Sequence, residues 1–155
     1  MNDLSDLIGP EAIDAGLSVT NKKTLFQQLA TAASRLSEAP SKQILTSLQQ
    51  REKLGSTGFG GGVAIPHGKI EGLPRIFGFF GRLAAPVDYN AIDNLPVDLV
   101  FLLLSPPDTG ADHLKALARV SRALRDRATL AKLRGARSKD AIFALLSGEE
   151  TLNAA

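Results

Sequence analysis

The apolar positions of this 155-residue chain fall into stretches with either helical or strand-like spacing. Residues 13–17 are typical of a short strand, and a helix follows whose apolar positions recur every three to four residues. Thr20 or Asn21 can cap this helix, because both residues precede its apolar stripe. The stripe consists of Leu25, Leu29, Ala32, Ala33 and Leu36. Residues 38–40 (Glu-Ala-Pro) interrupt the pattern, so we expect the helix to end there.

A second helix is expected to start near Ser41 and to lead into a glycine-rich segment. Its inward positions are Ile44, Leu45 and Leu48. Arg51 follows Leu48 by three residues, which places it on the inward side at the end of the helix. Residues 54–69 contain six glycines, so their backbone can adopt conformations closed to other residues. Within this segment, residues 63–65 (Val-Ala-Ile) predict a short buried strand that runs into Pro66, His67 and Gly68.

The second half of the chain predicts two longer strands and three helices. Residues 75–83 and 98–104 have the pattern of strands, and the second is nearly all apolar, as expected of a central strand. A helix is expected over residues 111–126, with four positions facing inward: Leu114, Leu117, Ser121 and Leu124. A short helix around Leu130 and Leu133 should end at Gly135. The last helix should be capped by Ser138, ended by Gly148 and packed through Ile142, Leu145 and Leu146.

The order of these elements predicts an α/β fold. Strands and helices interleave, but two consecutive helices separate the first strands. We therefore expect a three-layer α/β/α sandwich with a central mixed β-sheet. The length suits a single domain over residues 1–155, with a core of about 5–148. Residues 1–10 and the C-terminal tail 149–155 look like loose ends.

Composition excludes several classes of protein. Apolar residues make up 44% of the sequence and aromatic residues 5%, so the core must be mainly aliphatic. The 18 basic residues nearly balance the 16 acidic ones, which gives weak grounds for binding nucleic acid. The absence of cysteine excludes disulfides and thiol chemistry. The N-terminus lacks the pattern of a signal peptide and no apolar run approaches a membrane span, so we expect a cytoplasmic protein without membrane insertion.

The two histidines of the chain are its main candidates for chemistry. His67 lies just after a predicted buried strand, where Pro66 stiffens the approach and Gly68 leaves space beside the ring. This setting suits a side chain presented to a phosphate or a large partner, although a loop histidine without a role would look the same. His113 begins a predicted helix, where free N–H groups and the helix dipole favour an anion. The alternative for His113 is an exposed residue of the first turn.

Three polar side chains could bind the same anion. Arg51 could clamp a phosphate, or it could merely complement the dipole at the end of its helix. The hydroxyl groups of Ser56 and Thr57 could donate hydrogen bonds, or both residues could be ordinary turn residues. The four arginines of residues 119–127 fit a solvated helix face that could also help a partner to dock.

The glycine-rich segment does not match the known nucleotide-binding motifs. A P-loop requires Ser or Thr after Gly68-Lys69, where this chain has Ile70. A dinucleotide fingerprint starting at Gly58 would require glycine at Val63. The histidines with nearby aspartates form no short metal-binding motif, and the nucleophile elbow of serine hydrolases is missing. We therefore expect no cofactor and no metal.

Two segments resemble a known family. Residues 51–57 (REKLGST), followed by 63–68 (VAIPHG), resemble the signature of phosphotransferase-system enzyme IIA domains of the mannitol/fructose class. Residues 91–106 (AIDNLPVDLVFLLLSP) are similar to the nitrogen-regulatory branch, and His113 falls where the family has its second histidine. The resemblance covers roughly residues 5–148. One departure is Gly61, where members of the nitrogen branch often carry Asn.

The resemblance implies a function and its residues. In this family the histidine that matches His67 accepts a phosphoryl group, on Nε2, from a phosphohistidine of an HPr-like carrier. The residue that matches His113 helps to hold that group, and those that match Arg51 and Ser56 lie in the same site. The donor is already activated, so the resemblance implies neither ATP nor a metal. The expected protein is a phosphotransferase that regulates partner proteins, such as kinases or transporters, according to its phosphorylation state.

Two other functions stay open at this point. The first is a sugar-specific enzyme IIA that passes the phosphoryl group to a cysteine of an enzyme IIB during uptake. The second is a binding module that has lost phosphotransfer, which the presence of both histidines and Arg51 disfavours.

Overall fold

Two long antiparallel strands form the centre of the sheet in the computed structural model, which describes residues 3–148. They are β5 (Phe77–Val87) and β6 (Val97–Ser105). Every residue of β6 except Asp98 is buried, because the strand is covered on both faces. The remaining strands are β1 (Ile13–Leu17), β2 (Gly58–Gly60), β3 (Val63–Ala64) and β4 (His67–Lys69). The sheet is mixed: β1 is parallel to β5, β3 and β4 are parallel to β6, and β2 is antiparallel to β3.

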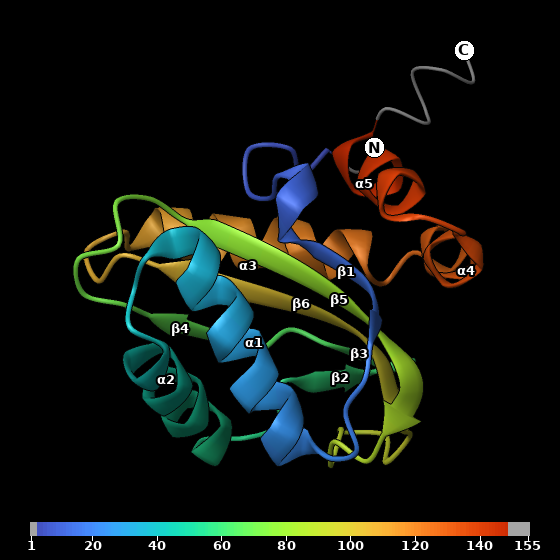
Figure 1. The fold of residues 1–155 in the computed structure, drawn as a ribbon, viewed down its shortest axis with the longest axis horizontal. Coiled ribbons are helices and arrows are strands. Elements are labelled where there is room, and N and C mark those ends of the chain that lie inside the picture. Colours follow the sequence, from blue (N-terminus) through green and yellow to red (C-terminus); the bar gives the residue numbers. More distant parts are fainter. Residues whose placement is uncertain (1–2, 149–155) are drawn as a thin grey trace.

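Helices cover both faces of this sheet (Figure 1). One face carries α1 (Lys22–Ser37) and α2 (Ser41–Lys53), and the other carries α3 (Ala111–Ala123). A 3-10 turn (Pro10–Ala12), α4 (Arg127–Gly135) and α5 (Lys139–Ser147) complete the order of elements. The prediction of a three-layer α/β/α sandwich with a mixed sheet is confirmed.

The predicted caps explain where several helices begin. Asn21 Oδ1 accepts a hydrogen bond from Thr24 N at 2.8 Å, and Thr24 Oγ1 accepts one from Asn21 N in return. Ser138 Oγ accepts from Ala141 N at 3.0 Å in the same way. Gly148 ends α5 with a φ of +81°, a left-handed conformation that suits glycine. These ends of α1 and α5 could therefore be predicted from local chemistry alone.

The glycine-rich segment contains two strands that its pattern did not predict. β2 and β4 are three residues long and lack apolar alternation, so they depend on pairing with distant strands. β4 is held by β6, with His67 opposite Leu103. β5 begins two residues later than predicted and continues to Val87, whereas β6 is one residue longer at each end, because the two strands still pair at Val87 and Val97.

The predicted inward face of α3 was wrong in part: Leu124 is buried and Leu117 is partly buried against the core, but Leu114 does not face inward. Leu114 is 66% exposed, and the buried stripe consists of His113, Ala116, Val120 and Ala123. Both sets have the spacing of a helix face, and the prediction followed the leucines rather than the small residues that fit closely against the sheet. The helix also ends at Ala123, before Asp126, because Asp126 caps α4 through a hydrogen bond from Thr129 N.

The N-terminal residues of the described range are not a loose end, contrary to expectation. Leu4, Leu7 and Ile8 are buried, and Leu4 N donates to Leu146 O at 2.8 Å. Arg119 joins this segment to α3 by bonding both carboxylate oxygens of Asp6 at 2.7 and 2.8 Å. The predicted loose tail, 149–155, lies outside the described residues. Within residues 3–148, no helix is long and apolar enough to cross a membrane.

Arg82 of β5 connects three parts of the fold through backbone carbonyls. Its guanidinium donates to Ala15 O in β1 at 3.0 Å, to Leu133 O at 3.0 Å and to Ala136 O at 2.5 Å. The last two carbonyls lie at the C-terminal end of α4, where a helix leaves carbonyl groups without partners. Arg82 thus caps α4 and fixes it to the edge of the sheet.

We predict that Arg82→Met lowers the free energy of unfolding by about 1–3 kcal/mol, because partly buried carbonyl groups lose a charged donor. Urea denaturation of both proteins measures the difference. Arg75→Met is the matched control, since Arg75 is exposed just before the same strand; it should change stability by less than about 0.5 kcal/mol. Equal stability of the Arg82→Met variant and the native protein would contradict the capping role.

Candidate functional site

Three elements bring the predicted site residues together. His67 is the first residue of β4, Arg51 lies in the last turn of α2, and His113 lies in the first turn of α3. The ring centroids of His67 and His113 are 5.8 Å apart, and Arg51 Nε lies 3.2 Å from His67 Nε2. Residues that are distant in the sequence therefore form one cluster at the N-terminal end of β4.

The hydrogen bonds of His67 define its protonation. Its Nδ1 lies 2.8 Å from Ile65 O, and a carbonyl oxygen can only accept, so Nδ1 carries the proton. In the neutral ring, Nε2 then has a lone pair, and this lone pair accepts a hydrogen bond from the Nε–H of Arg51. Burial lowers the pKa of His67 and Arg51 acts in the same direction, whereas Ile65 O and Glu52 oppose them. The ring is thus neutral and nucleophilic at Nε2 near neutral pH.

His113 is buried rather than an exposed residue of the first turn. Its side chain faces the sheet, and Nδ1 lies 2.6 Å from Ser105 Oγ. Burial lowers the pKa of His113, and the neighbouring His67 and Lys69 add to this effect. His113 is therefore also neutral near neutral pH, and one of its nitrogens remains available to the site.

Arg51 is anchored at both sides of its guanidinium group. While Nε–H points at His67, Nη1 donates to Gly55 O at 3.0 Å in the loop that follows α2. A guanidinium held in this way directs its Nε–H at the unprotonated nitrogen of His67. This geometry suits a phosphate-binding arginine.

A partly buried carboxylate, Glu52, holds the loop that carries the site. It accepts hydrogen bonds from Thr57 N at 2.9 Å and Thr57 Oγ1 at 2.6 Å, and it pairs with Lys22 of α1 at 2.8 Å. Thr57 Oγ1 also lies 2.7 Å from the hydroxyl of the fully buried Tyr89. Burial raises the pKa of Tyr89 well above its ordinary value, so the phenol stays protonated. This network joins α1, α2 and the glycine-rich segment.

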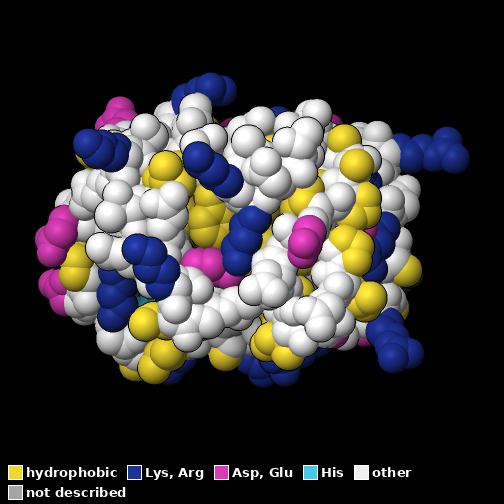
Figure 2. Space-filling model, turned by 90° about the horizontal axis from the view of Figure 1, so that it is seen from below, with side chains coloured by type: hydrophobic (Ala, Val, Ile, Leu, Met, Phe, Trp, Pro, Cys, Tyr) yellow, Lys and Arg dark blue, Asp and Glu magenta, His cyan; other side chains and the backbone are white. Residues whose placement is uncertain are grey.

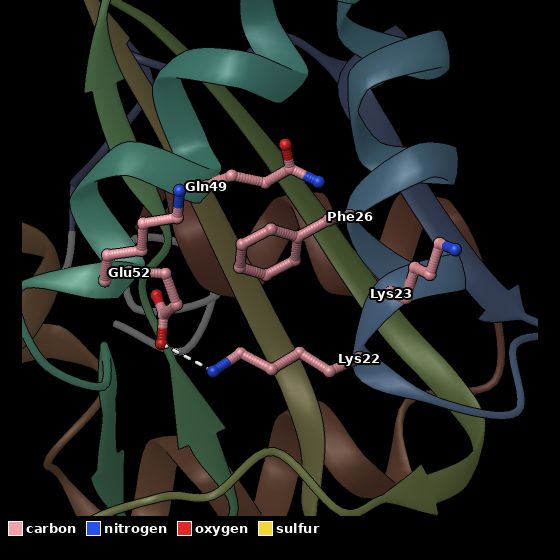
Figure 3. A pocket seen from close by; sticks show the side chains of 6 residues that line it. Lys22, Lys23, Phe26, Gln49 and Glu52 are labelled. Carbon is pink, nitrogen blue, oxygen red and sulfur yellow. Dashed lines mark hydrogen bonds and ion pairs between the residues drawn. The ribbon is translucent and has the colours of Figure 1, made fainter.

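Beside the site, a groove runs between α1 and α2. Its lining residues are Lys22, Lys23, Phe26, Gln49, Glu52 and Lys53. Figure 3 shows the Lys22–Glu52 ion pair across the groove, beside the Phe26 ring. Seen from below, basic side chains surround a hollow with an acidic group inside it, and little histidine surface is visible (Figure 2). Basic side chains therefore gather around this hollow (Figure 2).

The remaining predicted residues have specific positions. Thr57 is buried and contacts Glu52, and Ser56 Oγ accepts a hydrogen bond from Gly58 N at 3.1 Å in a local turn. Gly68 lies against Ser47 of α2, where a Cβ atom would collide with Ser47 Oγ. The missing side chain thus allows α2, and with it Arg51, to approach β4.

Gly61 lies in a turn away from the histidines. Residues Gly60, Gly61 and Gly62 have φ values of +109°, +69° and +82°. Gly61 N donates to Asp93 Oδ2 at 3.0 Å, and Gly61 O accepts from Arg134 at 2.7 Å. Asn tolerates this conformation better than other side chains, and the space beside Gly61 is open. The departure from the family at Gly61 therefore leaves the turn intact.

Three residues of the site were not assigned a role from the sequence: Glu52, Tyr89 and Ser105. Glu52 was part of the recognised motif, and its position next to Arg51 was the available signal. Tyr89 lies outside the segments that resemble the family, and Ser105 lies within residues 91–106 but was given no role there. The contacts that both residues make in the site depend on tertiary packing. Within residues 3–148, no group of three or more His, Asp or Glu side chains could hold a metal ion.

Comparisons with known proteins agree with this geometry. The family model for the phosphoenolpyruvate-dependent sugar phosphotransferase system, EIIA 2, matches residues 6–149. A nitrogen regulatory protein of Bradyrhizobium diazoefficiens is 51% identical over 93% of this chain and 94% of its own length. A nitrogen regulatory protein of Escherichia coli (strain K12) is 35% identical over 95% of this chain and 91% of its own length. The crystal structure of nitrogen regulatory protein IIA-Ntr from Neisseria meningitidis matches with a TM-score of 0.87 at 33% identity, covering 92% of this chain and 98% of that one.

The chain belongs to the EIIA type 2 family of the phosphotransferase system, whose members relay a phosphoryl group through a histidine. Within that family the chain is a member of the nitrogen-regulatory branch, because the relatives named above and the Neisseria structure are all nitrogen regulatory proteins. The predicted family, branch and phosphotransferase class are confirmed.

The two histidines predict how stability depends on pH. Both have a lowered pKa in the folded protein, so below their ordinary value of 6.5 the unfolded chain binds protons more readily. The free energy of unfolding should therefore fall as the pH drops through about 6.5 and level off below the folded pKa values. Urea denaturation between pH 7.5 and pH 5 measures the slope.

Replacing either histidine is the control for this prediction. His67→Gln and His113→Gln should each reduce the slope. The aspartates with a lowered pKa, such as Asp6, lose their contribution only below about pH 4, outside this window. A slope unchanged in both variants would show that other groups cause the dependence.

We predict that Gly68→Ala destabilises the protein by about 1–3 kcal/mol, as overpacking between α2 and β4 typically does. Ser47 Oγ could rotate away, but it would lose its hydrogen bond to Lys69 O. Adding Ser47→Ala should recover part of the loss, because the worst contact disappears. Gly16→Ala is the matched control, since open space surrounds Gly16. Stability unchanged in Gly68→Ala would contradict the packing role.

Proposed function

We propose that His67 Nε2 accepts a phosphoryl group from the phosphohistidine of an HPr-like carrier. The observation that carries this proposal is the Nδ1–H bond from His67 to Ile65 O, which leaves the lone pair on Nε2. As Nε2 forms its bond to phosphorus, the P–N bond of the carrier breaks and its electron pair stays on the carrier's nitrogen. The Nδ1 proton remains on His67, where Ile65 O stabilises the positive charge of the phosphorylated ring.

Arg51 and His113 are proposed to stabilise the transferred group. The Nε–H of Arg51 turns from Nε2 to a phosphoryl oxygen while Gly55 O keeps the guanidinium in place. His113 donates a hydrogen bond from the side facing His67. Phosphoryl transfer requires mainly positioning and charge stabilisation, which these preformed donors provide. Neither ATP nor a metal takes part in the proposed step.

Two exposed leucines support a docking surface around the site. Leu54 follows α2 and is 84% exposed, and Leu114 follows His113 and is 66% exposed. Exposed apolar side chains beside a reactive group are typical of protein interaction sites. We propose that the carrier covers these leucines during transfer and that regulated partners, such as kinases or transporters, use the same face. Nucleic acid and membranes are not among the proposed partners, and the proposed compartment is the cytoplasm.

Phosphorylation is proposed to regulate these partners through charge. It adds about −1.5 to −2 charges at neutral pH to a site bordered by Arg51 and Lys69. A partner with an acidic or apolar patch over His67 should bind the free form, and one with a basic patch should bind the phosphorylated form. Transfer onward to a cysteine of an enzyme IIB, with no partner that distinguishes the two forms, would favour the sugar-uptake role instead.

We expect the wild type to gain one phosphoryl group from a phosphorylated HPr-like carrier, and His67→Ala to gain none, as measured by intact mass. The product should be labile in acid, as a P–N bond is. His113→Ala should still be phosphorylated, but about 10²–10³-fold more slowly, the typical cost of one stabilising donor. Full phosphorylation of His67→Ala would refute the proposal, and an acid-stable product would point to Ser56 or Thr57.

A further inference from the structure

Ser105 is a buried hydroxyl group at the end of the central strand. It is the last residue of β6, it is fully buried, and its Oγ lies 2.6 Å from His113 Nδ1. Its backbone carbonyl accepts from Ile70 N at 2.8 Å, and β4 pairs with it through Lys69. The strand that positions His67 therefore also carries the group that contacts the second histidine.

The burial of Ser105 determines the direction of this hydrogen bond. A buried hydroxyl must donate its proton to an acceptor, and His113 Nδ1 is the partner that the described part of the chain gives it. If Ser105 donates, Nδ1 holds the lone pair and the proton of the neutral ring lies on Nε2. In the reverse arrangement, the hydroxyl proton of Ser105 would be buried without an acceptor, which is costly.

We propose that Ser105 is a positioning residue for phosphoryl transfer: its hydroxyl donates to His113 Nδ1 and so makes Nε2–H of His113 the donor to the phosphoryl group on His67. The proposal rests on the function proposed above. The two ring centroids are 5.8 Å apart, so the His113 ring lies within reach of a group bound to the His67 ring.

The two histidines then have opposite tautomers for opposite tasks. Ile65 O is an acceptor, so His67 carries its proton on Nδ1 and attacks with Nε2. Ser105 Oγ is a donor, so His113 carries its proton on Nε2 and can stabilise negative charge. A His113 with its proton on Nδ1 would direct a lone pair at the phosphoryl oxygens and repel them. The hydroxyl of Ser105 therefore decides whether His113 helps or hinders transfer.

The tautomer can be observed directly by NMR of imidazole-¹⁵N-labelled protein at a pH above both histidine pKa values. In the wild type, we expect His113 to show a protonated Nε2 and an unprotonated Nδ1, and His67 to show the reverse. Ser105→Ala should give a mixture of both tautomers at His113 and leave His67 unchanged. A protonated Nδ1 on His113 in the wild type would overturn the proposal.

Phosphorylation by the carrier tests the consequence for transfer. Ser105→Ala should lower the maximal rate about 3–10-fold, with an unchanged carrier concentration at half-maximal rate, because one positioning hydrogen bond is lost and docking is not affected. Ser105→Thr, which keeps the hydroxyl, should restore both the rate and the tautomer. Ser147→Ala, which changes another buried serine away from the histidines, is the matched control and should transfer at the wild-type rate.

A double-mutant cycle separates positioning from general destabilisation. In a His113→Ala background, Ser105→Ala should have no further effect on the rate, because the group that it orients is gone. An additive loss would overturn the proposal, as would a wild-type rate for Ser105→Ala alone. If the wild type were not phosphorylated at all, the proposed function would fail, while the NMR comparison would still decide the tautomer of His113.

Discussion

The pairing of β6 with its neighbours is the constraint on which the rest of the structure depends. On one side β6 binds β5 over most of its length, and on the other it holds β3 and the short β4. β4 lacks the apolar pattern of an independent strand, so its position follows from β6, and with it the position of His67. Because β6 also ends at Ser105 and leads toward α3, one strand positions both histidines.

The network below the site depends on a second constraint, the partial burial of the Glu52 carboxylate. A carboxylate that is removed from water must find donors, and Glu52 finds them in Thr57 and Lys22. Those bonds connect the end of α2 to the glycine-rich segment and to α1. Arg51 precedes Glu52 in the same turn of α2, so the contacts of Glu52 hold the backbone from which Arg51 reaches His67 and Gly55 O.

The sequence predicted the layers, the capped helix starts and the Arg51–His67–His113 cluster, because each of these follows from local chemistry or a specific motif. It did not predict β4 as a strand or Leu114 as an exposed residue. Short strands depend on distant partners, and adjacent faces of α3 have the same spacing. The hydrogen bond between Ser105 and His113 could not be predicted either, since it depends on how closely α3 approaches the end of β6.

The arrangement explains how one chemical group can change recognition without a change of fold. The groups proposed to receive the phosphoryl group are already anchored: Arg51 by Gly55 O and His113 by Ser105. The backbone therefore need not reorganise when the phosphoryl group arrives, so transfer carries little free-energy cost of reorganisation. The proposed modification would change the charge beside two exposed leucines, Leu54 and Leu114. A partner that contacts this face would be attracted or repelled directly by the added charge. The difference between its affinities for the two forms would depend on how completely its own surface excludes water from His67.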